Sequence, residues 1–264
     1  MVDLKKNEEQ LTSEVMSKIT LSKDKVNLEK HVVSLSKTVV DLSKKSGVDL
    51  GDTKARVVLA LDYSGSMSSL YREGIVQETL NRLVPLGLTF DDNGSIDVYL
   101  FENEYRKFDE LTINNYSDYI KQVIDKSDYN MGGTNYSKVL NAIIFGNKKA
   151  KKRGLFGFGK KKTSEEPLVN DEQPTFIIFI TDGDNFDKQE TDDVIRKSSK
   201  ENVFIQFIGI GNEKFKYLKE LDNLDGRERD NTGFVKLKKL ENVSDDELYN
   251  SVLEQFASWL KNEQ

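Results

Sequence analysis

The chain has 264 residues, of which 37% are hydrophobic and 32% are charged, and its formal net charge is -6. This acidic balance argues against nucleic-acid binding, and the absence of cysteine excludes disulfides and thiolate zinc sites. The single histidine, His31, lies in the first fifty residues, which disfavours catalysis by a histidine base. No stretch approaches the ~20 apolar residues of a membrane-spanning helix, so we expect a cytoplasmic protein.

The first fifty residues repeat a short phrase of the form V-x-L-x-K. Its copies begin at positions 19, 26, 33 and 40, with leucines at 21, 28, 35 and 42. The seven-residue period fits the apolar spacing of a helix, whereas the V-x-L alternation fits short strands. We expect strand-like or extended structure, with a helix as the alternative because no glycine or proline interrupts residues 1–46. The segment is too small for a core of its own.

Strand and helix patterns alternate from residue 54 onward, which is typical of a mostly parallel sheet with helices on both faces. Apolar runs predict strands at 56–61, 95–101, 175–181, 203–210 and 233–237, with a hairpin partner for the second at 105–108. Amphipathic spacing predicts helices at 69–86, 116–126, 137–145, 188–199, 215–221 and 245–261. The predicted fold class is α/β, a doubly wound sheet flanked by helices, with a short N-terminal extension.

A long insertion interrupts this alternation at about 148–173. Residues 148–162 read KKAKKRGLFGFGKKK, with eight basic and no acidic side chains, and the residues that follow reverse the sign of the charge. We expect a disordered surface loop. The alternative is weak contact with an anionic membrane through Leu155, Phe156 and Phe158, which would make the protein membrane-associated.

Side chains that carry oxygen gather at three points of this pattern. Asp62, Ser64 and Ser66 follow the first strand, Thr134 lies in a GGTN turn before a helix, and Asp182 follows the strand that ends at residue 181. Because functional groups of an open parallel sheet gather at the carboxyl ends of its strands, we expect these five residues to converge. Carboxylates and hydroxyls are hard ligands, so the set predicts a site for Mg2+, or for Ca2+ or Mn2+.

The simpler interpretation of each fragment is a helix cap or a turn. Caps and turns need not occur together in this order, which favours the metal site.

The fragments DYSGS, GGTN and TDGD, in this order and between these strands, resemble the metal-ion-dependent adhesion site (MIDAS) of von Willebrand factor A (vWA) domains. Apart from the insertion, residues 54–264 are similar to the vWA domain at the C-terminal end of TerF-type tellurium-resistance proteins. The LSK phrases of residues 1–53 resemble the opening strands of TerD-type domains. The resemblance implies two parts, an N-terminal repeat segment at 1–53 and a vWA-like domain at 54–264.

By this resemblance, Ser64, Ser66 and Thr134 supply hydroxyl ligands, and Asp62 and Asp182 act directly or through water. The implied function is not enzymatic. It is that of a protein-interaction module of the tellurium-resistance or stress-response type, whose metal accepts a carboxylate from a partner protein, such as another component of a stress complex. Tyr63 and Tyr136 beside the ligands could form an aromatic rim for that partner, or pack in the interior.

The main alternative is an enzyme, a Mg2+-dependent phosphoesterase-like hydrolase with Asp62 as its nucleophile or Asp184 as its base. Haloacid-dehalogenase-like phosphatases carry a second aspartate two residues after the first, where this chain has Ser64. The sequence also lacks a P-loop. These differences favour a binding module.

Overall fold

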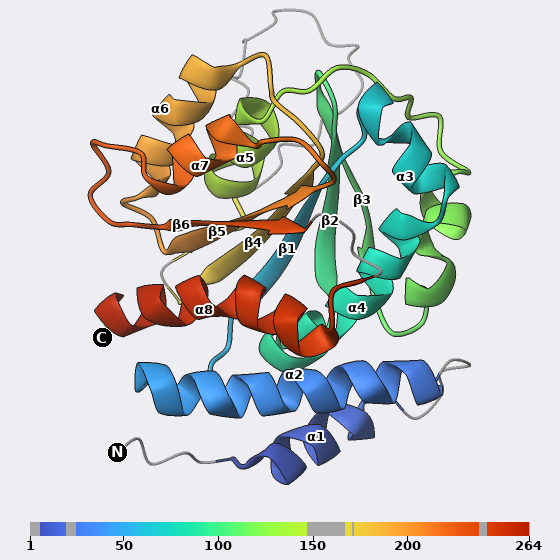
Figure 1. Ribbon diagram of the computed structural model, residues 1–264, viewed down its shortest axis with the longest axis vertical. Helices are drawn as coiled ribbons and strands as arrows, with labels where there is room; N and C mark the ends of the chain where they lie inside the picture. The colour runs from blue at the N-terminus through green and yellow to red at the C-terminus, as the bar shows by residue number, and fades with distance from the viewer. Residues whose placement is uncertain (1–5, 20–24, 147–166, 171, 238–241, 264) are drawn as a thin grey trace, which may run out of the picture.

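The computed structural model describes residues 6–19, 25–146, 167–170, 172–237 and 242–263. The strands in this part of the chain are β1 (Arg56–Asp62), β2 (Ile96–Phe101), β3 (Tyr105–Leu111), β4 (Thr175–Thr181), β5 (Val203–Ile210) and β6 (Thr232–Leu237). They form one sheet in the order β3-β2-β1-β4-β5-β6 (Figure 1). All neighbours are parallel except β2 and β3, which form the expected antiparallel hairpin.

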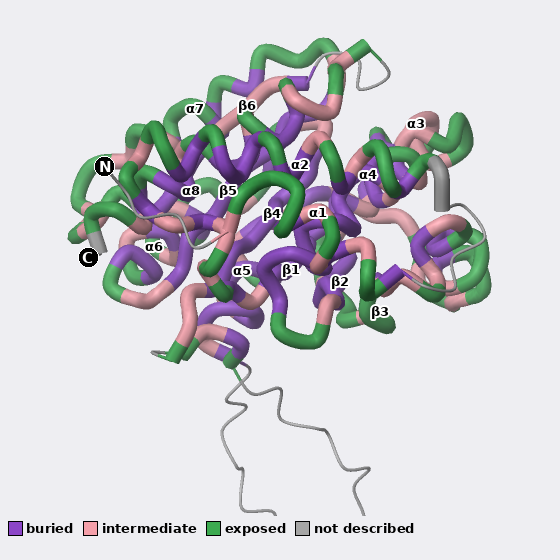
Figure 2. The backbone as a smooth tube through the Cα atoms, turned by 90° about the horizontal axis from the view of Figure 1, so that it is seen from below, coloured by how far each residue is buried: buried purple, intermediate pink, exposed green. Residues whose placement is uncertain are grey.

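The central strands are buried on both faces, as their nearly continuous apolar sequences predict. Every residue of β4 (TFIIFIT) and of β5 (VFIQFIGI) is buried, and Figure 2 shows these central strands in the buried interior of the molecule. Two sets of helices provide this cover. The α/β fold class, with a doubly wound and mostly parallel sheet, is confirmed.

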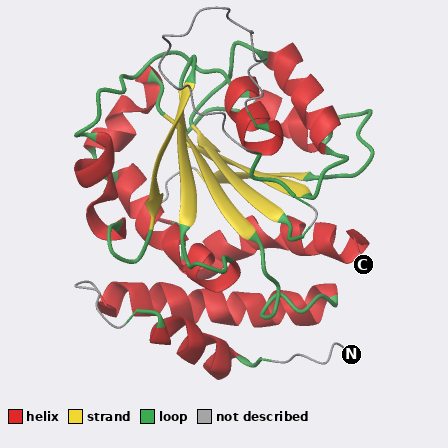
Figure 3. Ribbon diagram, turned by 180° about the vertical axis from the view of Figure 1, so that it is seen from behind, coloured by secondary structure: helices red, strands yellow, loops and turns green. Residues whose placement is uncertain are grey.

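The helices lie in layers on the two sides of the sheet (Figures 1 and 3). The α-helices of the described residues are α1 (Glu8–Ser17), α2 (Lys25–Ser46), α3 (Ser68–Arg72), α4 (Ile75–Phe90), α5 (Ser137–Phe145), α6 (Lys188–Ser198), α7 (Lys216–Asp222) and α8 (Asp245–Glu263). Apolar residues of α4 and α8 share one core with one face of the sheet, and those of α5, α6 and α7 share a second core with the other face. Helices α1 and α2 extend the first of these cores.

Two predicted helices differ from their expected form. The helix expected at 69–86 is divided into α3 and α4 at Gly74, whose φ of 78° is left-handed and suits glycine. The helix expected at 116–126 is a short 3-10 turn at Tyr116–Asp118 followed by one π-helical turn at Ile120–Ile124.

The expectation of strand-like structure in the N-terminal repeats is wrong, because residues 8–17 and 25–46 are helical. Val33 and Leu35 would share one face of a strand, yet Val33 is 41% exposed and Leu35 is buried. The buried set instead follows helical spacing: Leu28, Val32, Leu35, Val39 and Leu42. The seven-residue period was therefore the dominant signal, and the V-x-L alternation was incidental to it.

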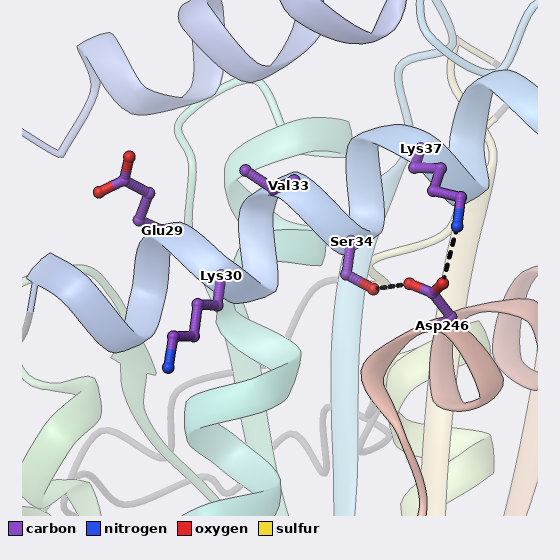
Figure 4. A pocket seen from close by; sticks show the side chains of 6 residues that line it. All are labelled: Glu29, Lys30, Val33, Ser34, Lys37 and Asp246. Atoms are coloured by element: carbon purple, nitrogen blue, oxygen red, sulfur yellow. Dashed lines mark hydrogen bonds and ion pairs between the residues drawn. The ribbon is translucent and has the colours of Figure 1, made fainter.

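Helix α2 packs on α8 through apolar residues and through polar contacts at the start of α8. His31 Nδ1 lies 2.6 Å from Asp245 Oδ2, and the Asp245 carboxylate also accepts a hydrogen bond from Arg82 Nε of α4 at 2.7 Å. Ser34 and Lys37 both contact Asp246, at the edge of a groove that Val33 also lines (Figure 4). These contacts fix the N-terminal helices against the rest of the molecule.

Two expectations concern membranes. In the part of the chain that the structure describes, no helix combines the length and the apolar character that a bilayer crossing requires. The basic segment 148–162, with its expected disorder and membrane contact, lies outside the described residues.

Candidate metal centre

The candidate site lies where the order of the strands reverses. Strand β2 pairs with one edge of β1, and β4, the next strand of the parallel series, pairs with the opposite edge of β1. Asp62 is the last residue of β1, and Asp182 directly follows β4. Ligands of open α/β sheets bind at such a crevice, outside the carboxyl ends of the strands.

Asp62 is the buried centre of this arrangement, with no measurable exposure. Its Oδ1 accepts a hydrogen bond from the Ser64 backbone N–H at 2.8 Å, and its Oδ2 accepts one from Thr181 Oγ1 at 2.6 Å. Burial raises the pKa of Asp62 to about 7, although the hydrogen bonds from Thr181 and Ser64 act to lower it. The carboxylate is held in one orientation in a position that favours a nearby positive charge.

Hydroxyl groups connect this buried end to the surface. Ser64 Oγ lies 3.0 Å from Ser66 Oγ, and Ser66 Oγ donates a hydrogen bond to Asp182 Oδ1 at 2.8 Å. Ser64 is buried and Ser66 is exposed. Burial raises the pKa of Asp182 too, against the hydrogen bond from Ser66. Four of the five predicted ligands thus lie in one continuous cluster that opens to solvent at Ser66.

The fifth predicted ligand, Thr134, lies in the adjoining GGTN loop. The backbone holds this loop against the first one, since Gly65 N–H donates to Gly132 O at 3.0 Å and Gly132 N–H donates to Tyr63 O at 3.3 Å. Thr134 is 7% exposed. Among the described residues, its hydroxyl makes no hydrogen bond to the other four side chains. The fold brings Thr134 to the same edge of the sheet, and its role as a ligand stays a prediction.

Asp187 fixes the GGTN loop to the loop that carries Asp182. Its carboxylate accepts hydrogen bonds from the backbone N–H groups of Tyr136 and Ser137, at 2.9 and 2.8 Å, where α5 begins. Burial acts to raise the pKa of Asp187, but these hydrogen bonds outweigh it and hold the pKa below its usual value. The sequence analysis missed this residue because an aspartate fifty residues away gives no local sign of capping a helix.

The donor set fits a hard divalent cation. It combines two carboxylates with neutral hydroxyls, all of them oxygen ligands. Neither Asp62 nor Asp182 takes part in an ion pair among the described residues, so their charge has no protein cation to balance it. Within the same residues no group of three or more histidine, cysteine, aspartate or glutamate side chains is placed to hold a metal. A metal here would therefore depend on the serine and threonine hydroxyls.

Aromatic residues surround the cluster in three different ways. Tyr136 is fully buried and its hydroxyl donates to Gly183 O at 2.6 Å, so it packs in the interior. Tyr63 is partly buried and stacks on Tyr129, with ring centroids 5.7 Å apart. Phe186, which the sequence analysis did not single out, is 83% exposed. Its position directly after the TDGDN fragment was the only available signal.

Comparison with known proteins gives two matches in sequence. The family model vWA-TerF-like, described as the vWA found in the TerF C terminus, matches residues 54–156 and 161–264. The uncharacterized protein YcbR of Bacillus subtilis (strain 168) is 36% identical over 209 residues, which is 78% of each chain. Residues 1–53 lie outside the family match, and their helices differ from the opening strands that the resemblance to TerD-type domains implied.

Solved structures show more distant likeness. Proximal thread matrix protein 1 from the mussel byssus matches with 20% identity and a TM-score of 0.48 over 78% of this chain. A second structure of that protein, with a zinc-occupied MIDAS motif, matches with 18% identity and a TM-score of 0.49 over 87% of this chain. The present chain spans about half the length of these structures, 48% and 52%.

Proposed function

We propose that this chain, which belongs to the vWA-TerF-like family, is a divalent-metal-dependent protein-interaction module that binds an acidic side chain of a partner protein. Asp62, Ser64, Ser66, Thr134 and Asp182 would hold the ion, with Mg2+ as the first candidate. The ion would supply an electrophilic position for the partner's carboxylate. The proposed setting is a cytoplasmic stress-response assembly of the tellurium-resistance type.

The observation that carries this proposal is the continuous contact from Asp62 through Ser64 and Ser66 to Asp182. It joins a fully buried carboxylate at the end of β1 to a partly exposed one at the end of β4. A cation bound there would be neutralised by the protein on its inner side and would remain open to a ligand on the side of Ser66. A carboxylate from a partner can complete such a coordination shell.

Affinity capture tests the proposal, with the full chain as bait in Mg2+ and in EDTA. We expect partner proteins that elute with EDTA and that bind again when Mg2+ is restored. The Ser66→Ala variant should capture much less of them, because Ser66 is exposed and its loss removes one ligand without disturbing the core. Ser68→Ala is the matched control, since Ser68 is also exposed and lies two residues further along the chain. Partners that remain bound in EDTA and to Ser66→Ala would contradict the proposal.

The phosphoesterase alternative has a separate test. Both oxygens of the Asp62 carboxylate already accept hydrogen bonds from the protein, and the residue is fully buried. A nucleophile must instead reach the phosphorus atom of its substrate. Hydrolysis of p-nitrophenyl phosphate that requires Mg2+ and is lost in Asp62→Asn would replace the binding function by the enzymatic one.

A further inference from the structure

Phe186 exposes an aromatic ring beside the candidate metal centre. The residue is 83% exposed, and within the described part of the chain the only other large apolar residue that is markedly exposed is Val33, on α2. Aromatic side chains are enriched at the centres of protein interfaces, where a few of them supply most of the binding free energy. Whether Phe186 can contribute to an interface at the candidate metal centre therefore depends on where its ring lies.

The backbone beneath this ring is held firmly on both sides. Phe186 N–H donates to Thr134 O at 2.9 Å, and the next residue, Asp187, caps α5. The preceding residue, Asn185, is buried and donates hydrogen bonds to Asp187 Oδ1 at 2.7 Å and to Thr191 Oγ1 at 3.0 Å. A partner that covers this ring would therefore have to order little additional backbone, which lowers the entropic cost of binding.

The ring also lies against the loop of the predicted ligand Thr134. A Cβ atom at Gly133 would come within 3.3 Å of the Phe186 Cε2 atom and would collide with the side chain of Asn103. Phe186 follows Asp182 by four residues, and the Asp182 carboxylate contacts Ser66. The exposed ring and Asp182 therefore lie on the same loop after β4, and that loop contacts both the loop of Ser66 and the loop of Thr134.

We propose that Phe186 is the apolar contact of this site, and that the partner presents a peptide segment with an apolar side chain within a few residues of an aspartate or glutamate. The inference rests on the proposed function, because the acidic residue is the one that binds the metal. The apolar residue covers the Phe186 ring, and the carboxylate enters beside Ser66. This pairing would give the site a sequence preference that a metal alone cannot supply.

The probe is a displayed library of random short peptides, panned on the full chain in Mg2+ and eluted with EDTA. From the wild-type protein we expect peptides enriched in an acidic residue with an apolar neighbour. From Phe186→Ala we expect the acidic residue and the EDTA sensitivity to remain while the apolar enrichment disappears. A synthetic peptide of the wild-type consensus should bind Phe186→Ala about ten-fold more weakly or worse. Val33→Ala removes the other exposed apolar side chain and should select the same peptides as the wild type.

Two further measurements test whether Phe186→Ala is folded and binds metal as the wild type does. Its thermal unfolding and its affinity for Mg2+ alone should equal those of the wild type, because the ring is outside the core and has no ligand atom.

The outcomes separate the two proposals. Suppose that the selected peptides are acidic and EDTA-sensitive but show no apolar preference, or show an apolar preference that persists in Phe186→Ala. Either result would overturn the role of Phe186 and leave the proposed metal-dependent function standing. An apolar preference that depends on Phe186 but not on Mg2+ or an acidic residue would overturn the proposed function and keep Phe186 as a contact. A library that yields no specific peptide would overturn both.

Discussion

Ser66 Oγ donates a hydrogen bond to Asp182 Oδ1 at 2.8 Å, which joins the loops after β1 and β4 across 116 residues of sequence. Both side chains are on the open side of the oxygen cluster, whereas Asp62 and Ser64 are buried. Substitutions at Ser66 and Asp182 can therefore test metal binding with little change to the core.

The first prediction concerns metal affinity. Ser66→Ala and Asp182→Asn should each weaken the binding of Mg2+ and Mn2+ by at least ~10-fold, since each removes one oxygen ligand or its charge. Isothermal titration of the full chain with each ion measures this directly. The same ions should raise the melting temperature of the wild type more than that of either variant, because a ligand that binds only the folded state stabilises it.

Ser68→Ala is the control for this series and should bind both ions as the wild type does. Equal affinities of Ser66→Ala and Ser68→Ala for Mg2+ and Mn2+ would show that the oxygen cluster is not the metal site.

The second prediction concerns Asp187, which caps α5 from the loop that follows β4. Asp187→Ala should lower the free energy of unfolding by about 1–2 kcal/mol at pH 7, because the N–H groups of Tyr136 and Ser137 lose their acceptor. The folded-state pKa of Asp187 lies below its ordinary value of 3.8, so its stabilising effect is fully present above about pH 4. That effect is lost as the pH falls through the folded-state pKa. Urea unfolding of both proteins at neutral pH and near pH 3 should show the difference shrink.

Asp184→Ala is the matched control for Asp187→Ala. Asp184 pairs with Lys188 at 3.1 Å, but both side chains are largely exposed, at 60% and 46%. An exposed pair of this kind contributes little to stability, so Asp184→Ala should unfold almost as the wild type does. A loss of stability as large in Asp184→Ala as in Asp187→Ala would show that the cap is not the cause.

The sequence predicted the sheet well where burial alone decides the structure. The strands at 175–181 and 203–210 were located to the residue, since a continuous apolar run bounded by polar residues leaves little choice for the ends of the strand. The sequence could also predict that the strand-end residues Asp62, Ser64, Ser66 and Asp182 lie close together, because parallel strands bring their carboxyl ends to one edge of the sheet. Their role as ligands stays a prediction.

The remaining features depend on contacts that the local sequence does not contain. The choice between strand and helix for α2 depends on whether Val33 and Leu35 are buried together, and only Leu35 is buried. The exposure of Phe186 is set by the loops around it, since a phenylalanine that follows polar residues in sequence is as compatible with burial as with exposure. Such features follow from tertiary packing, which overrides short sequence patterns.

The third prediction concerns the attachment of the N-terminal helices. Asp245, at the start of α8, contacts His31 of α2 and Arg82 of α4, and the Arg82 side chain is only 6% exposed. Burial acts to raise the pKa of Asp245, but the hydrogen bond and charge of His31 and the charge of Arg82 hold the pKa below its usual value. Asp245→Asn should lower the free energy of unfolding by about 3 kcal/mol, because the charged acceptor shared by His31 and Arg82 is lost while Arg82 keeps its hydrogen bond to Val243 O.

Asp246→Asn is the control, since Asp246 is the next residue and is 48% exposed beside Lys37. It should lower the free energy of unfolding by less than about 1 kcal/mol. Limited proteolysis gives an independent readout, because weaker contacts between α2 and α8 should speed cleavage within residues 25–46 of Asp245→Asn. The effect should be much smaller in Asp246→Asn, whose contacts with α2 are more exposed. Equal unfolding free energies and equal cleavage rates in the two variants would mean that apolar packing of α2 holds the N-terminal helices in place without help from Asp245.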